Sequence, residues 1–210
     1  MLDFEQAAAE CGIIAILRGI TLDEVAAVGD ALFAAGIRIV EVPLNSPDPF
    51  RSIAALAARF RGRMVVGAGT VLDSGSVDRV KSAGGQISVS PDCNPEVISR
   101  AVERGLVPLP GVFTPTEAFA ALRAGAVHLK LFPAEAASPR TVKAWKAVLP
   151  KHARLYAVGG VTPSNMQEWA DAGCAGFGVG SNIYKPGMSA DDAGRAARQF
   201  MAAWAALRGT

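Results

Sequence analysis

The chain has 210 residues, of which 50% are hydrophobic and 19% charged, and this composition excludes an intrinsically disordered protein. Its formal net charge is only +2, with acidic and basic residues interspersed, so no surface for nucleic acid or an anionic membrane is indicated. No apolar run approaches the roughly 20 residues of a membrane span. The acidic start "MLDFEQAAAE" is unlike a secretory signal. We therefore expect one domain over residues 1–210, located in the cytoplasm.

Eight short apolar runs follow one another along the chain, and we expect each to form a buried strand. They are "IIAIL" (13–17), "IRIVEVP" (37–43), "MVVGAGT" (64–70), "QISVS" (86–90), "LVPLP" (106–110), "VHLKLF" (127–132), "LYAV" (155–158) and "GFGVG" (176–180). Alanine-rich amphipathic segments separate or follow them and predict helices over residues 22–35, 49–60, 76–83, 95–104, 116–124, 139–148, 163–172 and 190–206.

The helix boundaries carry recognisable signals. Thr21 ahead of Asp23 and Glu24, and Thr162 before Pro163, predict capped helix starts at these points. Glycine follows the last apolar position in "AAG" (34–36), "SAGG" (82–85), "RAG" (123–125) and "DAG" (171–173). Each of these glycines predicts a left-handed cap at the end of a helix.

Near-continuous apolar strands that alternate with helices are typical of a parallel sheet covered by helices. Eight such units predict a single (β/α)8 TIM barrel of the α/β class, and at this length little chain is left for a second domain. An open, doubly wound sheet is the alternative interpretation.

In a barrel, alternate strand residues point inward, and the residues at the carboxyl ends of the strands face the active-site mouth. Lys130 lies near the end of the sixth apolar run and Glu41 lies in the second. Arg18 directly follows the first run, and Thr70 ends the third. We expect these four side chains to converge on one end of the barrel.

A lysine on a buried strand needs a reason, because removing an unpaired ammonium group from water is costly. One interpretation is a buried ion pair between Lys130 and Glu41. The other is catalytic, since burial near a second cation such as Arg18 lowers the pKa of a lysine and produces a nucleophilic amine. Arg18 also fits a surface salt bridge, and the Thr70 hydroxyl also fits a cap for the following helix.

Two glycine-bearing loops, "VGGVTP" (158–163) and "GVGS" (178–181), follow the last two predicted strands. Exposed backbone N–H groups at such positions bind anions, and the loops after strands seven and eight commonly hold phosphate in barrels. Tight turns are the alternative reason for the glycines. The sequence thus predicts a phosphate pocket beside the last two strands.

The remaining polar candidates suggest no metal site. His128 precedes Lys130 by two residues, so it shares the inward face one layer deeper, where a hydrogen-bonded core imidazole is favoured over a catalytic one. Cys11, Cys93 and Cys174 form no CxxC pair, and His152 is far from His128. Reduced thiols are expected, with neither disulfides nor zinc.

The segments "AILRGI", "EVPLNSP", "GAGTVL", "LKLFPAEA" and "AVGGVTP" occur in this order along the chain. Together they resemble the class I bacterial aldolases that cleave 2-keto-3-deoxy-6-phospho sugar acids. The resemblance covers essentially the whole chain. It implies a (β/α)8 barrel, usually a homotrimer, that forms a Schiff base between a lysine and the substrate ketone without a metal or other cofactor.

The resemblance also implies roles for individual residues. Lys130 would form the Schiff base and Glu41 would be the general acid and base. The others would bind substrate: Arg18 and Thr70 the carboxylate or neighbouring oxygens, Pro91 and Phe132 the pyruvate moiety, and Gly159, Gly160, Gly180 and Ser181 the 6-phosphate.

Two departures separate branches within the resembled family. Gluconate-type enzymes typically carry "EVTLRTP" and a threonine before the glycine pair, whereas this chain has "EVPLNSP" and Val158. Both departures match the 6-phosphogalactonate-type branch, whose products are pyruvate and glyceraldehyde 3-phosphate. A gluconate-type or 4-hydroxy-2-oxoglutarate aldolase is the nearest alternative. A phosphosugar isomerase or epimerase would usually use paired carboxylates or a histidine-rich metal site at the strand ends. A non-catalytic phosphate-binding barrel would need no lysine pointing into the barrel.

Overall fold

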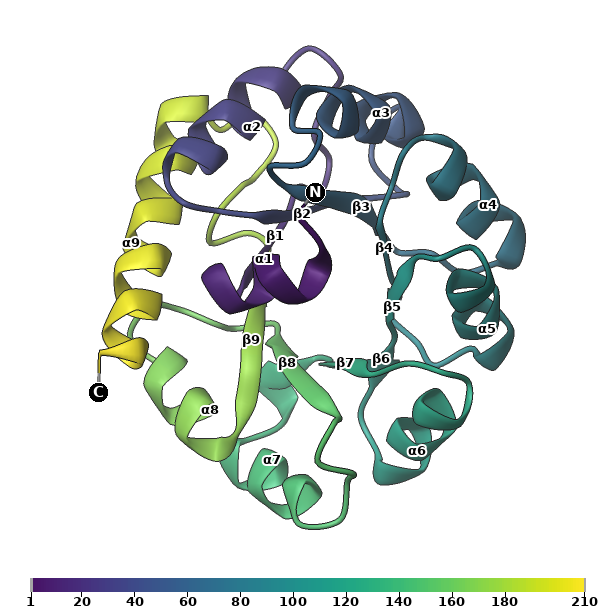
Figure 1. The fold of residues 1–210 in the computed structure, drawn as a ribbon. Helices are drawn as coiled ribbons and strands as arrows, with labels where there is room; N and C mark the ends of the chain where they lie inside the picture. Colours follow the sequence, from purple (N-terminus) through teal and green to yellow (C-terminus); the bar gives the residue numbers. More distant parts are fainter. Residues whose placement is uncertain (1, 210) are drawn as a thin grey trace.

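A computed structural model describes residues 2–209, and it shows parallel strands surrounded by helices (Figure 1). Every strand pairing is parallel, and the sheet order is β5-β4-β3-β2-β1-β9-β8-β7-β6. The strands are β1 (Ile13–Ile16), β2 (Ile39–Pro43), β3 (Val65–Gly69), β4 (Ile87–Val89), β5 (Val107–Leu109), β6 (Gly111–Val112), β7 (His128–Leu131), β8 (Arg154–Val158) and β9 (Cys174–Val179). The barrel prediction is confirmed, and the open doubly wound sheet is wrong.

The predicted strand over residues 106–110 corresponds to β5, and a further short strand, β6, that was not predicted follows Pro110, so the described residues contain nine strands instead of eight. β5 pairs with β4, whereas β6 pairs with β7. Proline has no N–H to donate to a strand ladder, which explains a break at this residue. Its carbonyl still accepts a hydrogen bond from the backbone N–H of Lys130, with an N···O distance of 2.9 Å. The barrel therefore closes through two short strands at Pro110.

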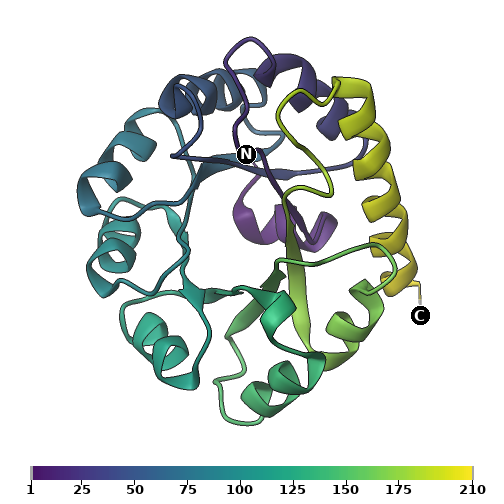
Figure 2. The ribbon, with the colours of Figure 1, turned by 180° about the vertical axis from the view of Figure 1, so that it is seen from behind.

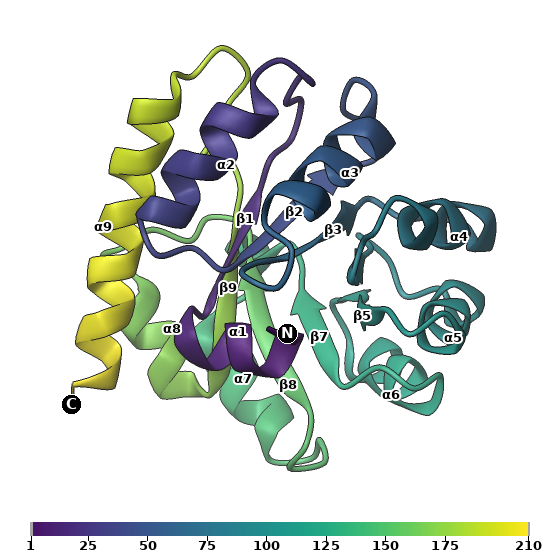
Figure 3. The ribbon, with the colours of Figure 1, turned by 45° about the horizontal axis from the view of Figure 1, so that its top comes forward.

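Helices form the outer ring of the barrel, and α9 lies beside α2 in two different views (Figures 1 and 3). The ring contains α2 (Val25–Ala34), α3 (Pro49–Arg59), α4 (Ser74–Ser82), α5 (Pro95–Glu103), α6 (Pro115–Arg123), α7 (Pro139–Lys146), α8 (Met166–Ala172) and α9 (Ala190–Arg208), with a short 3-10 turn η1 (Ala134–Ala136) before α7. Within residues 2–209, none of the helices combines the length and apolarity that crossing a membrane requires.

The predicted helix ends are confirmed, but two predicted helix starts are wrong. Gly36, Gly84, Gly125 and Gly173 all have positive φ, between 86° and 106°, as left-handed caps require.

The residues at the N-cap positions of α2 and α8 are Glu24 and Asn165 instead of the two threonines. The backbone N–H and the hydroxyl of Thr21 both donate to Glu24 Oε2, at 3.0 and 2.6 Å, and the N–H of Thr162 donates to Asn165 Oδ1 at 2.9 Å. α2 begins at Val25 and α8 at Met166, each three residues later than expected.

Helix α1 (Phe4–Glu10) was not predicted, and it lies across one end of the barrel (Figures 1 and 2). Asp3 and Gln6 form a capping box that starts the helix, and this pair is visible in the sequence. The buried side chains of α1 join the apolar interior of the barrel, which comprises Phe4, Ala7, Ile14, Ile39, Val65, Ile87, Val89, Leu109 and Tyr156. α1 therefore closes the amino-terminal end of the barrel, and the carboxyl end of the strands is left for a site.

Candidate active site

Lys130 lies on β7 with its side chain buried at 6% exposure. Its Nζ is 4.3 Å from the centroid of the Phe132 ring, a cation–π distance. Burial lowers the pKa of Lys130; the charge of Glu41 opposes this shift, and the charge of Arg18 adds to it. Lys130 is thus held where its neutral, nucleophilic form is favoured relative to a lysine in water.

Glu41 lies on β2 and is only 2% exposed. Burial raises the pKa of its carboxyl group to about 7, although the charges of Lys130 and Arg18 both oppose the shift. Its Oε2 atom is buried without a hydrogen-bond partner. Among the described ion pairs, none joins Glu41 to Lys130, so the interpretation of the two as a direct buried ion pair is wrong. At neutral pH this carboxyl is poised both to give and to accept a proton.

A narrow cavity inside the barrel joins these two groups. It is lined by Ile14, Ile16, Glu41, Val89, Leu109, Lys130, Tyr156, Val158 and Gly178. The sequence prediction that Lys130 and Glu41 meet within the barrel is confirmed by this shared cavity.

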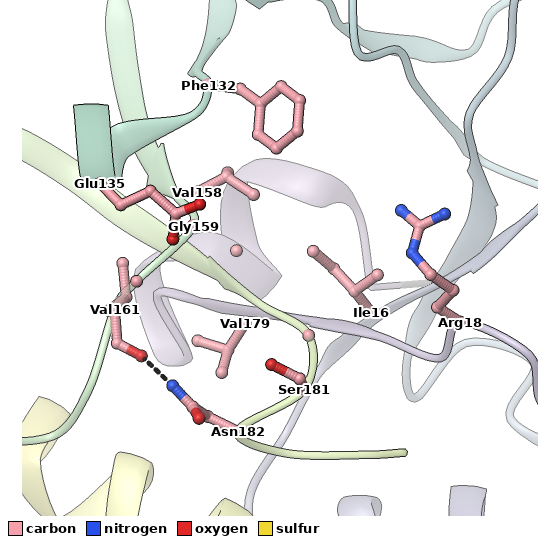
Figure 4. Close-up of a pocket in the computed structure, with 13 residues that line it drawn as sticks. Ile16, Arg18, Phe132, Glu135, Val158, Gly159, Val161, Val179, Ser181 and Asn182 are labelled. Atoms are coloured by element: carbon pink, nitrogen blue, oxygen red, sulfur yellow. Dashed lines mark hydrogen bonds between the residues drawn. The ribbon is translucent and has the colours of Figure 1, made fainter. Parts of the chain in front are cut away.

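A larger pocket of about 240 Å³ opens beside it at the carboxyl end of the strands (Figure 4). Its lining comes from the ends of β1, β7, β8 and β9: Ile16, Arg18, Phe132, Glu135, Val158, Gly159, Gly160, Val161, Gly178, Val179, Gly180, Ser181 and Asn182. Ile16, Val158 and Gly178 line both spaces and therefore stand between them. A molecule bound in the larger pocket is thus adjacent to the cavity of Lys130.

The two glycine loops form one wall of this pocket, as the sequence predicted. Gly159 and Gly160 have φ values of 105° and 69°, which glycine adopts without strain. The side chain of Asn182 donates a hydrogen bond to the carbonyl of Val161 at 2.8 Å and ties the second loop to the first (Figure 4). Glycine-rich backbone beside the arginine of the opposite wall has the chemistry of an anion site.

Arg18 lies on that opposite wall (Figure 4). Its Nη1 donates a hydrogen bond to Asn45 Oδ1 at 2.9 Å. The next residue, Gly19, donates its N–H to the buried Ser46 Oγ at 2.9 Å. None of the ion pairs of residues 2–209 involves Arg18, so the surface salt bridge considered for it is wrong. The guanidinium is thus oriented by a neutral partner and keeps its charge available to a ligand.

Thr70 and Pro91 lie at the same end of the barrel but line neither cavity. Both are half-buried. Thr70 has φ +57°, a left-handed conformation that is rare outside glycine. It does not cap α4, because Asp73 accepts the hydrogen bond from the N–H of Ser76 at that helix start. The helix-cap interpretation of Thr70 is therefore wrong.

Several lining residues were missed from the sequence, including Ile16, Glu135 and Asn182. Ile16 lies two residues after Ile14 on β1, so both side chains point into the barrel, and the alternation of side chains along a strand could have predicted it. Glu135 belongs to η1, and its side chain packs over Gly160 of the neighbouring loop. No sequence signal indicates that contact, because it depends on how two loops fold toward each other.

His128 lies deeper in the barrel than Lys130 and lines neither cavity. Its Nε2 is 2.9 Å from Glu5 Oε1, and its ring packs edge-on against Phe4 with centroids 4.6 Å apart. Burial lowers the pKa of this imidazole, and the Glu5 charge opposes the shift. The interpretation as a hydrogen-bonded core histidine is confirmed. Among the described residues, no group of three His, Cys, Asp or Glu side chains is arranged to hold a metal.

Comparison with known proteins identifies the family. Residues 4–198 match the family model described as "Aldolase: KDPG and KHG aldolase". The chain belongs to this family. It is therefore an aldolase, a lyase whose chemistry the buried lysine and carboxyl group suit.

Relatives within the aldolase family agree with this assignment. The chain is 48% identical over 192 residues to the 2-dehydro-3-deoxy-6-phosphogalactonate aldolase of Escherichia coli, covering 91% of this chain and 94% of that protein. It is similar to a solved structure described as native KDPGal, with 46% identity, a TM-score of 0.93, and coverage of 94% and 96%.

A more distant solved member is the KDPG aldolase of Legionella pneumophila, in which pyruvate was captured as a covalent carbinolamine intermediate. It is 27% identical, with a TM-score of 0.83, covering 92% of this chain and 95% of that one. The family resemblance, the barrel and the aldolase class predicted from the sequence are confirmed.

Proposed function

We propose that this chain is a class I aldolase that cleaves 2-dehydro-3-deoxy-6-phosphogalactonate to pyruvate and D-glyceraldehyde 3-phosphate. The observation that carries the proposal is Lys130, buried without an ion-pair partner among the described residues and sharing a narrow cavity with Glu41. The 48% identity to the Escherichia coli enzyme supports the choice of sugar acid. The gluconate-type substrate is the alternative.

Catalysis begins with attack of the neutral Lys130 amine on the C2 ketone of the substrate. This forms a carbinolamine, which loses water to give a protonated imine between Nζ and C2. Glu41 donates a proton to the departing hydroxyl, consistent with a pKa of about 7. The imine carries a positive charge beside C3 and becomes the acceptor for the electrons of the bond to be broken.

Cleavage follows when Glu41, now ionised, takes the proton of the C4 hydroxyl, directly or through water. The electrons of the broken O–H bond form the C4=O double bond, the C3–C4 electrons become the C2–C3 double bond, and the C2–N π electrons return to nitrogen, giving an enamine and free glyceraldehyde 3-phosphate. Protonation at C3 and hydrolysis of the imine then release pyruvate and regenerate Lys130. No cofactor takes part in these steps.

The remaining residues bind the two ends of the substrate. Arg18 holds the carboxylate, with Thr70 near neighbouring oxygens and with Pro91 and Phe132 against the pyruvate moiety. The backbone of Gly159, Gly160 and Gly180, with Ser181, holds the 6-phosphate in the larger pocket, and Val158 lies between the two ends and contacts the C4 region. We further propose that residues 1–210 act as one catalytic domain in a cytoplasmic homotrimer.

Borohydride reduction in the presence of pyruvate tests the covalent step. The expected product is one reduced pyruvyl group on Lys130, located by peptide mass spectrometry, and Lys130→Ala abolishes it. Lys143→Ala is the matched control, because Lys143 lies on the outer helix α7, and this variant should label normally. A label found on Lys143 or Lys146 would overturn the assignment. Rates measured with both C4 epimers decide between the galactonate-type and gluconate-type substrates.

A further inference from the structure

The carboxyl group of Glu41 lies directly against Gly69 of the neighbouring strand β3. An ideal Cβ placed on Gly69 would be 2.0 Å from Glu41 Oε2, 2.4 Å from Cδ and 2.5 Å from Oε1. Contacts below 3.0 Å are essentially never seen for a real Cβ atom. The three nearest atoms all belong to one carboxyl group, which therefore occupies the space that any side chain at position 69 would need.

The strand register shows in which direction the Glu41 side chain leans. The residue opposite Glu41 on β3 is Gly67, whereas Gly69 is opposite Pro43. The carboxyl group thus lies two residues closer to the carboxyl end of β3 than its own backbone does. This lean directs it toward the active-site mouth, along the cavity that it shares with Lys130.

Backbone conformation does not explain the glycine at position 69. Gly69 is absent from the positive-φ glycines of the described residues, and glycine inside a strand weakens the strand. Gly67, on the same face of β3, has a different role: its Cβ would be 2.2 Å from the backbone carbonyl oxygen of Ile87. Gly67 allows strand β4 to approach, whereas Gly69 makes room for a functional group.

We propose that Gly69 is a positioning residue that holds the Glu41 carboxyl group in the narrow cavity that it shares with Lys130. The inference rests on the proton-transfer role proposed for Glu41. A methyl group at position 69 would displace the end of a flexible side chain and leave the backbone in place, so the barrel of a Gly69→Ala variant should still form. The displaced carboxyl group would no longer reach the reacting oxygen.

A double-mutant cycle on turnover tests this proposal. Gly69→Ala should lower kcat by about 10²-fold or more, the scale on which general acid–base groups act. Gly69→Ala combined with Glu41→Gln should be no slower than Glu41→Gln alone, within about twofold. The titration with a pKa near 7 should also move or vanish in the pH–rate profile of Gly69→Ala. Multiplied losses in the double variant, or a wild-type rate and pH profile for Gly69→Ala, would overturn the proposal.

A second double-mutant cycle, measured as Tm instead of turnover, tests the proposal even where activity is lost. Gly69→Ala should lower the Tm when Glu41 is present, and the loss should largely disappear in a Glu41→Ala background, where the space is free. An equal Tm loss in both backgrounds would also overturn the proposal. Gly75→Ala on α4 is the matched control, since its Cβ meets only Asp73 Oδ1 at 3.2 Å. Pyruvate labelling of Lys130 in the wild type separates a failure of this proposal from a failure of the aldolase mechanism.

Discussion

The two ends of the barrel treat buried polar groups in opposite ways, and strand β7 shows the contrast over two residues. At the amino-terminal end, His128 is covered by Phe4 of α1 and its Nε2 pairs with Glu5 Oε1, although its Nδ1 has no hydrogen-bond partner within residues 2–209. At the carboxyl end, neither Lys130 nor Glu41 has an ion-pair partner among the described residues, although both are buried. The ion pair of His128 stabilises the fold, whereas burial without an ion-pair partner shifts the pKa of Lys130 and Glu41 toward values suited to chemistry.

The largest effect should come from removing the unpaired ammonium group. Lys130→Met should lower kcat by at least about 10⁴-fold, because losing a nucleophile removes the whole covalent route. Its Tm should be equal to or above that of the wild type, since a buried amine without an ion-pair partner among the described residues is replaced by an apolar side chain of similar size. Steady-state assays and thermal unfolding measure the two effects. A Tm several degrees lower would show that Lys130 stabilises the fold.

Glu41→Gln should lower kcat by about 10²–10⁴-fold, the range of a general acid–base group. The variant should also change how stability depends on pH. The folded pKa of Glu41, about 7, is raised above its ordinary value of 4.5, so its contribution to stability is present below pH 4.5 and is lost as the pH rises through 7. The wild-type Tm should fall across this window, and the variant should show a smaller fall. An unchanged slope would contradict the raised pKa.

At the closed end, Phe4→Ala should lower the free energy of unfolding by about 3 kcal/mol, as for other large core truncations. Phe4 is 4% exposed and contacts His128 and Tyr156, which lie on two different strands. The kcat of the folded variant should remain near that of the wild type, because α1 lies at the end away from the larger pocket. Urea unfolding and an assay below the transition check both statements, and a large loss of kcat would show that the two ends are coupled.

A smaller effect is expected at the passage between the two cavities. Val158→Thr should shift the ratio of kcat/KM for the gluconate-type over the galactonate-type substrate upward by about tenfold, since one neutral hydrogen bond contributes ~0.5–1.5 kcal/mol. The wild type should prefer the galactonate type, because valine offers only bulk at this position. Rates for both epimers on both proteins decide the matter, and a wild-type preference for the gluconate type would contradict the branch assignment.

The smallest effect, no change at all, is expected from metal removal. Prolonged EDTA treatment should leave kcat intact, because the proposed imine accepts the electrons of the broken bond and no three metal-binding side chains meet within residues 2–209. The assay is turnover before and after dialysis against EDTA. Activity that is lost and then restored by a divalent ion would point to a metal-dependent reaction.

The alternation of side chains along a strand was sufficient to predict that Lys130 and Glu41 point into the barrel. Lys130, Glu41 and the glycine loops follow from alternation along strands and from the rule that barrel sites lie at carboxyl ends. The cavity contacts of Glu135 and the position of Thr70 outside the lining depend on loop conformations that no local pattern determines. Helix α1 was missed because only Phe4 and Ala7 of its seven residues are buried, which is too few for a periodic signal. Its capping box was the available clue.

Because the strands are interrupted at Pro110, fewer backbone pairs hold the sheet together there than between β2 and β3. β5 and β6 hold their neighbours through three and two residue pairs, whereas β2 and β3 share five. Two of the backbone hydrogen bonds near the break are longer than the 2.9 Å bond that Pro110 accepts from Lys130, with N···O distances of 3.2 Å from Ser90 to Leu109 and 3.3 Å from Phe132 to Val112. Amide protons at this seam should exchange with solvent sooner than those of β2 and β3. Because the backbone N–H of Lys130 bonds to Pro110, local opening of this part of the wall would reach the strand that carries the nucleophile.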